Sequence, residues 1–402
     1  MTNDPFKRWN LTPIINASGT MTSIGASRVA PQTRALVDRI LDSFVDMDEL
    51  QASAGTVISR VTGSEAGCVT ACSAAAMTQS VAACLTGSDL ARIEALPKAM
   101  GNRRVLLQMG HMVNYGAPVD QAIRLAGAEV VPIGTAAACE TWHLRAELEQ
   151  GAAAALYVVS HHTVRENELP LDIFVALCRE HGVPTIVDMA SEYDLVGPIA
   201  LGASAVIYSG HKFLSGVTSG IVAGTSELIR ATYLQHRGIG RTLKAGKESV
   251  VGAMAALELW EVRDHDNVRL AEEARVNRWL DDLTGIAGLI VEPHADWTGN
   301  PITRVLIKVE PDVAGFHAWE LAGRLEARIP RIVVRSGLAE RQEIYLDPCN
   351  LSDDEAVQVS TAIGDEAARL RTGGIGKSVS WSEVKAEREA ATLAWRGNGD
   401  AA

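Results

Sequence analysis

The sequence lacks an excess of positive charge, a long apolar run and a paired-cysteine motif. Its 402 residues contain 37 Lys and Arg against 49 Asp and Glu, so the formal net charge is −12. Nucleic acids and anionic membranes attract basic proteins, and this balance argues against both as partners. No apolar run reaches the length of a membrane span, and the first ten residues contain no signal core. We therefore expect a cytoplasmic enzyme that acts on a small molecule.

Metal ligands with a recognisable spacing are also absent. None of the six cysteines belongs to a C-x-x-C pair, which argues against a zinc site and favours reduced thiols. His161 and His162 are adjacent, but neighbouring side chains of an extended chain point to opposite sides, so we do not expect both to bind one ion. No metal is predicted, and we assign His161 a substrate-facing role.

The pattern of apolar runs divides the chain into four segments. Residues 1–48 form an N-terminal arm and helix, 49–250 a large domain, 251–371 a smaller α+β domain and 372–402 a tail. A hydrophobic content of 47% over this length predicts a large core. The INASGT stretch near the N-terminus has no sustained period and is typical of a loop, either on the surface or reaching toward an active site.

The most informative stretch spans residues 184–224. Its short apolar runs, bounded by Gly and Pro, are typical of buried strands. One run ends on Asp188, and the next ends on Ser209, with His211 and Lys212 directly after it. Open α/β sheets bind their ligands at strand ends of this kind. The polar groups are therefore expected to meet at one edge of a sheet.

An acid and a lysine at adjacent strand ends suit pyridoxal phosphate. This cofactor needs a lysine for its Schiff base and a carboxylate for its pyridinium nitrogen. Lys212 would provide the first group and Asp188 the second. Ser209 would hydrogen-bond the phosphate, and His211 would contact phosphate or substrate. Singly, each residue would more often be structural, but their combination favours the cofactor site.

A second segment predicts an anion site. Ser73, Ala74 and Ala75 open an Ala-rich helix that runs to about Leu85 and stops at Gly87. Small residues at a helix start expose backbone N–H groups, which bind anions together with the helix dipole. We assign the cofactor phosphate to these three residues. The alternative is a plain serine N-cap without a ligand.

Three further positions complete the predicted site. His111 follows a strand at 104–108 and is expected to stack on the pyridine ring as a catalytic residue. Arg335, beside a strand at 332–334, is expected to bind a substrate carboxylate. Lys247 is expected to contact the cofactor phosphate.

Lys247 is the last of three cations in a glycine-punctuated segment, after Arg241 and Lys244. Such a segment is either a solvated basic turn or a phosphate contact, the latter in its own site or in that of a neighbouring subunit.

Several motifs taken in order resemble a known family. They are INASGT, TGSEAG, the small-residue helix start, Q-x-x-H, IVDMAS, YSGHK and KAGKES. The chain resembles fold-type I pyridoxal-phosphate enzymes of the selenocysteine-synthase-like group, and within it the D-glucosaminate-6-phosphate ammonia-lyase branch, over residues 11–365. This resemblance implies an α/β transferase fold with a mostly parallel sheet and a smaller α+β C-terminal domain. It also implies Lys212 as the Schiff-base lysine, Asp188 as its pyridinium partner, and a homodimer or larger assembly with sites between subunits.

Two departures from the family pattern bear on the substrate. His211 replaces the second glycine of S-G-G-K, and Met109 and Met112 stand where members often have a lysine and an arginine. The loss of these cations argues against a phosphorylated sugar acid. The net charge of −12 argues against the tRNA substrate of selenocysteine synthases.

We therefore expect a lyase that acts on a small hydroxylated or β-substituted amino acid. Lys212 would act as the base at Cα, and loss of the β substituent would lead to a 2-oxo acid and ammonia. Reprotonation of the same carbanion would make a racemase or epimerase, and retro-aldol cleavage would make an aldolase. A non-catalytic protein of this fold would not need Lys212. The residues alone leave lyase, racemase and aldolase open.

Overall fold

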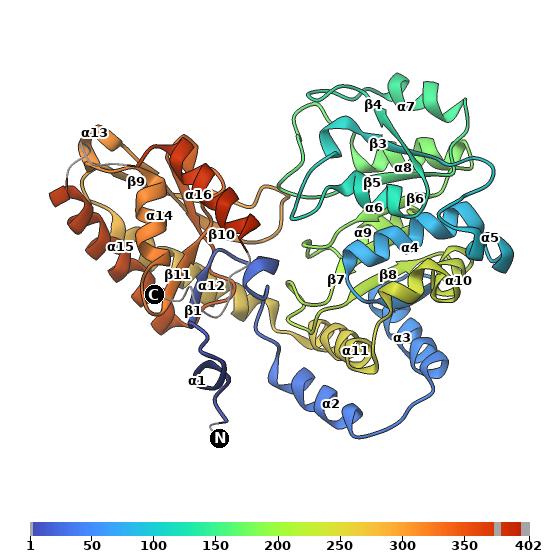
Figure 1. Cartoon of the computed structure of the whole chain (residues 1–402), viewed down its shortest axis with the longest axis horizontal. Helices are drawn as coiled ribbons and strands as arrows, with labels where there is room; N and C mark the ends of the chain where they lie inside the picture. Colours follow the sequence, from blue (N-terminus) through green and yellow to red (C-terminus); the bar gives the residue numbers. More distant parts are fainter. Residues whose placement is uncertain (1–2, 374–378, 395–402) are drawn as a thin grey trace. The chain divides into compact units, whose positions relative to one another are not determined.

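The computed structural model describes residues 3–373 and 379–394. These residues form two compact units (Figure 1). Unit 1 contains the chain up to residue 26 and from residue 264 onward, and unit 2 contains residues 27–263. The four segments expected from the sequence break at other positions and remain predictions about domains. The tail at 372–402 lies partly outside the described residues.

Unit 2 is organised around a seven-stranded sheet with the strand order β2-β8-β7-β6-β5-β3-β4. Strand β8 runs antiparallel to both of its neighbours, and every other neighbouring pair is parallel. This mostly parallel sheet confirms the predicted α/β fold class. The strands are β2 (Ala66–Thr70), β3 (Arg104–Gln108), β4 (Glu129–Ile133), β5 (Ala154–Val158), β6 (Thr185–Asp188), β7 (Ala205–Ser209) and β8 (Gly220–Gly224).

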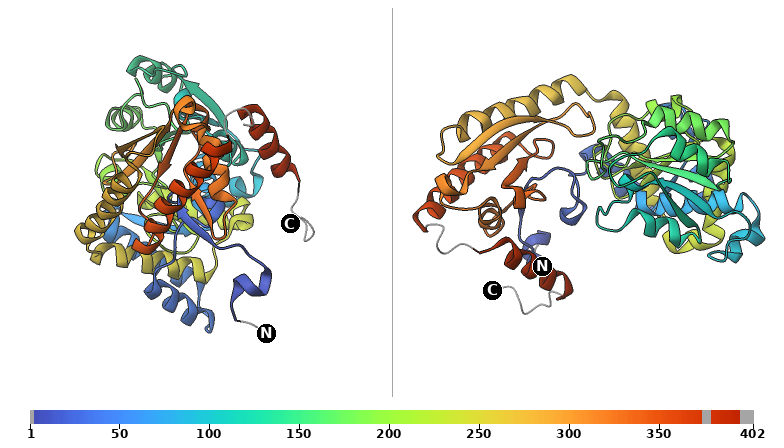
Figure 2. Two further views of the ribbon diagram at one scale, coloured as in Figure 1. Left: turned by 90° about the vertical axis from the view of Figure 1, so that its left-hand side faces the viewer. Right: turned by 90° about the horizontal axis from the view of Figure 1, so that it is seen from above.

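Helices cover both faces of this sheet (Figure 2), and we name the faces after α4 and α8. Alternate strand residues point to opposite sides, so Ile186 packs on the α4 face and Val187 on the α8 face. Helices α4, α6 and α10 cover the first face, and α3, α7, α8 and α11 the second. The helices of unit 2 are α2 (Pro31–Leu41), α3 (Met47–Thr62), α4 (Ser73–Thr86), α5 (Leu90–Ala95), α6 (Val119–Leu125), α7 (Thr141–Leu148), α8 (Leu171–Glu180), α9 (Gly197–Ala200), α10 (Ser226–Leu234) and α11 (Lys247–Val262).

Unit 1 is a smaller α+β assembly, as predicted. Strands β9 (Leu289–Ala295), β10 (Thr303–Val309) and β12 (Glu343–Leu346) form an antiparallel sheet with β10 in the centre. The N-terminal segment expected to be a loop contains β1 (Ile14–Ala17), which pairs in parallel with β11 (Arg331–Val334). Local sequence could not predict this strand, because its partner lies more than 300 positions away in the chain.

Helices complete unit 1, and its core includes the fully buried Trp279 and Phe316. Among the described helices of the chain, none has the length and apolar character needed to cross a membrane. Unit 1 contains α1 (Pro5–Trp9), α12 (His265–Leu283), α13 (Pro311–Ala314), α14 (Ala318–Glu326), α15 (Asp353–Gly373) and α16 (Trp381–Leu393).

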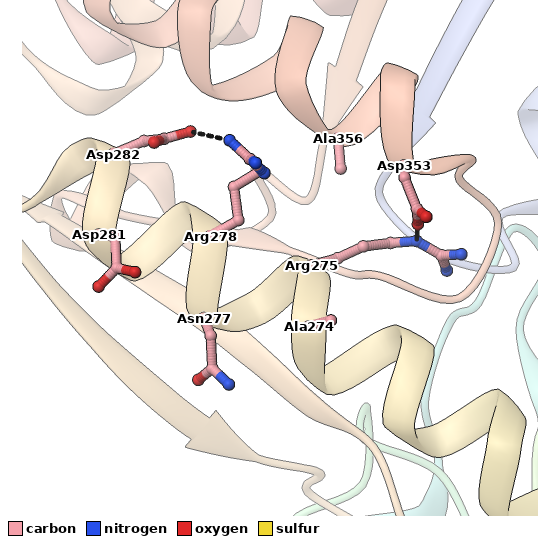
Figure 3. Close-up of a pocket in the computed structure, with 8 residues that line it drawn as sticks. All are labelled: Ala274, Arg275, Asn277, Arg278, Asp281, Asp282, Asp353 and Ala356. Atoms are coloured by element: carbon pink, nitrogen blue, oxygen red, sulfur yellow. Dashed lines mark hydrogen bonds and ion pairs between the residues drawn. The ribbon is translucent and has the colours of Figure 1, made fainter.

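A hollow of about 540 Å³ lies between α12 and α15 (Figure 3). Four of its charged side chains form two pairs, since Arg275 Nε lies 2.8 Å from an Asp353 oxygen and Arg278 Nη1 lies 3.8 Å from an Asp282 oxygen. No residue predicted for the active site lines this hollow, and we assign it no function.

Candidate active site

The strand register brings the predicted residues of unit 2 to one edge of its sheet. Thr70 at the end of β2 pairs with Gly220, which in turn pairs with Ser209 at the end of β7. Asp188 at the end of β6 pairs with Ile207 on β7. The start of α4, Ser209 and Asp188 therefore lie along one edge. The alternation of side chains places Asp188 and Ser209 on the α4 face.

Asp188 is a buried carboxyl, with 6% of its surface exposed. It accepts a hydrogen bond of 3.1 Å from the Ala190 N–H. Burial raises the pKa of Asp188 to about 6, although attraction to Lys212 and the Ala190 hydrogen bond act in the other direction. The ionised form is therefore costly here, and a further cation against this carboxyl would be stabilised.

Lys212 follows β7, and its amine donates a hydrogen bond of 2.5 Å to Ser191 Oγ. Ser191 lies just after β6, so the two partners come from adjacent strands. The turn that carries Lys212 is closed by a 3.0 Å bond from the Ser215 N–H to the Lys212 carbonyl. Sequence reasoning missed Ser191 as the partner of the amine, although its position three residues after Asp188 was a usable signal.

Ser209 and His211 form a buried polar pair beside Lys212. Ser209 Oγ and His211 Nδ1 are 3.2 Å apart. Burial and then the positive charge of Lys212 lower the pKa of His211. Its imidazole is therefore neutral at pH 7, and one ring nitrogen can still donate a hydrogen bond.

Helix α4 begins where the sequence predicts the phosphate site, and the binding of an anion there stays a prediction. Cys72 is the N-cap, and its sulfur accepts from the Ala75 N–H at 3.4 Å. Ser73 is the first helical residue, and the N–H groups of a first turn have no carbonyl partner within the helix. Gly220 permits this arrangement, because a Cβ there would lie 2.3 Å from the Cys72 carbonyl oxygen.

His111 lies elsewhere than the sequence suggested. Its ring is fully buried and packs edge-on against Tyr157, with 4.5 Å between centroids. Tyr157 belongs to the α8-face core, whereas Asp188 lies on the opposite face. One ring nitrogen accepts from the Val158 N–H at 3.2 Å, and the other pairs with Glu168 at 3.0 Å. A ring with no exposed face has no surface to stack on a cofactor, which corrects the expected role.

Tyr115 is an aromatic residue that sequence reasoning missed. It lies between β3 and α6, in a segment whose Val113 packs on the α4-face core. Burial raises the pKa of Tyr115, and the charge of Asp188 raises it further. About a third of its surface, 36%, is exposed. No sequence motif marks this position, and only the folded loop reveals it.

The paired histidines do not follow the extended-chain argument. His161 and His162 lie in a turn, and their rings face the same region, with 3.9 Å between centroids. The assumption that they point apart was wrong because the strand ends before them. Both are exposed. Within residues 3–373 and 379–394, no group of three or more His, Cys, Asp or Glu residues is placed to hold a metal ion.

The three predicted cations after β8 differ in their surroundings. Arg241 and Lys244 are exposed. The Lys247 amine donates to the carbonyl oxygens of Leu41, at 3.0 Å, and Ser43. Its predicted contact with a cofactor phosphate stays a prediction.

Arg335 belongs to unit 1, where it directly follows β11. Its backbone forms a bridge with Tyr345.

Comparison with known proteins supports the same kind of enzyme. The chain is 35% identical to a D-glucosaminate-6-phosphate ammonia lyase of Salmonella typhimurium, over 92% of this chain and 98% of the relative. A solved D-glucosaminate-6-phosphate ammonia-lyase structure superimposes with a TM-score of 0.82 at 34% identity, covering 92% of this chain and all of that one. A 5'-C-glycyluridine monooxygenase-decarboxylase of a Streptomyces species is 34% identical over 87% of this chain and 88% of its own length.

More distant matches define the wider group. An L-seryl-tRNA(Sec) selenium transferase of Serratia proteamaculans is 25% identical over 63% of this chain and 58% of its own length. The Bacillus subtilis ureidoglycine-glyoxylate aminotransferase, at 12% identity, has a TM-score of 0.59 over 91% of this chain and 96% of its own, and shares the fold. No model of a protein family matches the chain. The chain belongs to the D-glucosaminate-6-phosphate ammonia-lyase family of fold-type I pyridoxal-phosphate enzymes, in the selenocysteine-synthase-like group, and is a lyase that acts on an amino-acid derivative.

Proposed function

We propose that the enzyme eliminates a β substituent, such as a hydroxyl group, from a small amino acid and releases a 2-oxo acid and ammonia. The observation that carries this proposal is the position of Lys212 and the buried Asp188 at adjacent strand ends. The 35% identity to an ammonia lyase supports the same reaction class.

The residues at the α4 face suit pyridoxal phosphate. Asp188 is a buried carboxyl that lacks a paired cation within ion-pair distance in the described chain, and a protonated pyridine nitrogen would be one. The N–H groups of residues 73–75, with Ser209 and His211, would hold the phosphate. When bound, the cofactor supplies an electron sink that stabilises negative charge at Cα. Lys247 is also proposed to contact the phosphate, as a residue of a neighbouring subunit.

Lys212 is the residue proposed to move protons during the reaction. Its amine, oriented by Ser191 at 2.5 Å, removes the proton from Cα. The resulting ammonium then gives that proton to the departing hydroxyl, so that the Cβ–O bond breaks and water leaves. Asp188 would hold a proton on the pyridine nitrogen when the cofactor is bound. The released enamine takes up water and hydrolyses to the 2-oxo acid and ammonia, so that the water lost is regained.

Tyr115 takes the place proposed for His111 from the sequence. The segment that carries Tyr115 packs through Val113 on the α4-face core, the face that carries Asp188, whereas His111 is enclosed on the α8 face. An aromatic ring packed on the pyridine ring would hold it by offset stacking. His111 is proposed instead to position the end of β5 through its bond with Val158.

A small, unphosphorylated substrate is the class we favour. Met109 and Met112 are each 39% exposed and offer no charge to a phosphate group. Arg335 is proposed to bind the substrate carboxylate, as a guanidinium does through paired hydrogen bonds. His161 is kept as a proposed substrate contact because its ring is exposed beside the end of β5.

The reaction is tested by incubating the holoenzyme with D- and L-serine and D- and L-threonine. We expect a 2-oxo acid and ammonia in equal amounts from at least one of the four. Inversion of configuration without ammonia would assign a racemase, and release of an aldehyde would assign an aldolase. Either result would replace the proposed elimination. The variant Lys212→Ala serves as the control for adventitious activity.

Oxidative decarboxylation is a second candidate, favoured by the 34% identity to a monooxygenase-decarboxylase. It would consume dioxygen and release carbon dioxide, neither of which the elimination involves. An oxygen electrode during turnover separates the two reactions. Uptake of dioxygen in step with substrate loss would favour this candidate, and unchanged oxygen would reject it.

We also propose that the enzyme works as a homodimer or larger assembly in which Arg241 or Lys247 supports the cofactor phosphate of a neighbouring subunit. The exposure of Arg241 supports this role. Replacing Arg241 by Ala should weaken cofactor retention on dilution, whereas Lys98→Ala, at another exposed cation, should not. A monomer in light scattering that keeps its cofactor and activity would contradict the proposal.

A further inference from the structure

Arg335 in unit 1 has hydrogen-bond donors that nothing in the described chain satisfies. Its Nη2 reaches the Ser18 carbonyl at 3.4 Å. Its Nε and Nη1 atoms are buried and have no hydrogen-bond partner among the described residues. Buried polar groups are almost always paired in native proteins. The unsatisfied guanidinium edge therefore indicates an anion that joins it.

Trp297 packs against this guanidinium. Its ring centroid lies 5.1 Å from Arg335 Cζ and 5.0 Å from Arg304 Cζ. Tyr345 meets the same indole edge-on, with 5.0 Å between centroids. A cation within about 6 Å of an indole face is attracted by its quadrupole. The indole thus holds Arg335 through its face and leaves the N–H edges of the guanidinium for a ligand.

The side chain of Asp296 holds the loop that carries Trp297 in place. Asp296 Oδ1 accepts hydrogen bonds from the N–H groups of Thr298, at 2.9 Å, and Asn300, at 3.1 Å. Its other oxygen pairs with Arg304. Although burial opposes ionisation, hydrogen bonds from Arg304 and Thr298 lower the pKa of Asp296 to about 2. The loop therefore keeps its charge and its conformation through the neutral pH range.

Arg304 ties this loop to the strand beside Arg335. Its Nε lies 2.8 Å from Asp347 Oδ2, and only 3% of Arg304 and 1% of Asp347 are exposed. Two carboxylates thus neutralise Arg304, whereas Arg335 has no ion pair within 4 Å in the described chain. The two cations that contact the indole therefore differ in role. Arg304 is bound by two carboxylates and anchors the loop, whereas the guanidinium of Arg335 is available to bind a ligand.

The N-terminal INASGT motif lies against Arg335 and Asp347. Asn16 accepts from the Ser18 N–H at 2.9 Å and donates to the Gly19 carbonyl at 2.8 Å, which forms a tight turn. Gly19 has φ +84°, and a Cβ there would lie 2.7 Å from Asp347 Oδ2 and 3.3 Å from Arg335 Nη2. The turn therefore approaches Arg335 as only a glycine allows.

We propose that Trp297 is a positioning residue that presents Arg335 to a carboxylate ligand, with Arg304, Asp296 and Asp347 as its anchor. Trp297 does not touch the reacting atoms. It fixes the guanidinium so that its unsatisfied N–H groups face the ligand. This inference rests on the proposed function only in taking the carboxylate to be that of the substrate.

The ligand contact is tested directly by ¹⁹F NMR of the full-length holoenzyme labelled with 5-fluorotryptophan. The Trp297 signal is the one lost in Trp297→Phe. Titration with propionate, a simple carboxylate, should shift this signal to saturation in the wild type. It should not shift in Arg335→Ala, and the signal of the exposed Trp142 should stay in place. An unmoved Trp297 signal in the wild type would overturn the inference.

Kinetics separate positioning from a structural role. Trp297→Leu should raise the KM for the amino-acid substrate about tenfold, the size expected of one desolvated cation–π contact, with kcat within about threefold. Trp297→Phe, which keeps an aromatic face, should recover most of the loss. Trp142→Phe is the matched control, because its indole stacks on His143 at the surface. Equal KM values for wild type and Trp297→Leu would reject the role.

The two proposals can fail independently. Saturable propionate binding that depends on Arg335 and Trp297, without any release of 2-oxo acid, would keep the present inference and remove the proposed elimination. If the enzyme releases 2-oxo acid but its Trp297 signal does not shift with propionate, the proposed elimination stands and the role of Trp297 is rejected. If Trp297→Leu fails to fold, the Trp297→Phe and Arg335→Lys variants in the same titration still decide the question.

Discussion

Asp188 in unit 2 and Asp347 in unit 1 are both buried carboxyls at strand ends, yet their pKa values shift in opposite directions. Asp347 is bonded by Arg304 at 2.8 Å and by the Cys349 N–H at 3.1 Å. Burial opposes its ionisation, but attraction to Arg304 and Arg335 outweighs this and lowers its pKa. For Asp188, burial dominates and raises the pKa to about 6. Asp347 therefore has its cation within the fold, whereas the cation that we propose for Asp188 is the pyridine nitrogen of the cofactor.

Removing the charge of Asp347 should have the largest effect on stability. Asp347→Asn leaves Arg304 buried with only part of its compensation, and we expect the free energy of unfolding to fall by roughly 3–5 kcal/mol. Urea denaturation followed by circular dichroism measures this loss. The control is Asp353→Asn, which breaks the exposed pair with Arg275 and should cost less than about 1 kcal/mol. Equal losses in the two variants would remove the distinction between them.

Asp188→Asn should have the opposite profile, with a large loss of activity and an intact fold. The amide cannot hold a proton on the pyridine nitrogen, and we expect turnover to fall about 100- to 1,000-fold, as when a preorganised electrostatic group is deleted. Steady-state kinetics of the cofactor-loaded variant measure this loss. Turnover close to that of the wild type would show that another group holds the nitrogen.

The pH dependence of stability in the cofactor-free protein tests the raised pKa of Asp188. Asp188 has a folded pKa of about 6, above the unfolded value of about 3.9. Between these values the folded state binds more protons, so its contribution to stability falls as pH rises from about 4 to about 6, by at most about 3 kcal/mol. The difference between wild type and Asp188→Asn in urea denaturation at pH 4.5 and pH 7 isolates this effect. A difference that does not change with pH would contradict the raised pKa.

Replacing Tyr115 should have the smallest of these effects, and it tests on which face of the sheet the cofactor binds. Loss of one stacked ring in Tyr115→Leu should raise the cofactor dissociation constant by about tenfold. Tyr115→Phe should stay close to the wild type. Equilibrium dialysis against pyridoxal phosphate gives the three constants without relying on turnover. An unchanged constant in Tyr115→Leu would leave the ring position to another residue.

The residues of the central stretch could be predicted because their signals are local. Short apolar runs end on Asp188 and Ser209, the two strands are neighbours in the sheet, and Lys212 follows within three residues. The Ala-rich start of α4 was equally visible, and its N-cap is Cys72 instead of the serine of the plain-cap alternative.

The remaining features depend on how distant segments meet. The side of the sheet on which His111 lies is decided by a one-turn helix at residues 109–111, which turns its ring toward Tyr157. The strand in the INASGT segment exists because β11 lies beside it. The anchoring of Arg335 by Trp297 joins residues 38 positions apart, and no spacing rule predicts such a contact.

The most direct test is the identity of the residue that holds the cofactor. Holoenzyme is reduced with borohydride, digested and analysed by mass spectrometry for the pyridoxyl label. The label should lie on Lys212 alone, and the visible absorbance of the cofactor should disappear on reduction. Lys212→Ala should fold normally and remain unlabelled. A label on any other lysine, or cofactor absorbance that survives reduction, would contradict the assignment of Lys212 as the residue that holds the cofactor.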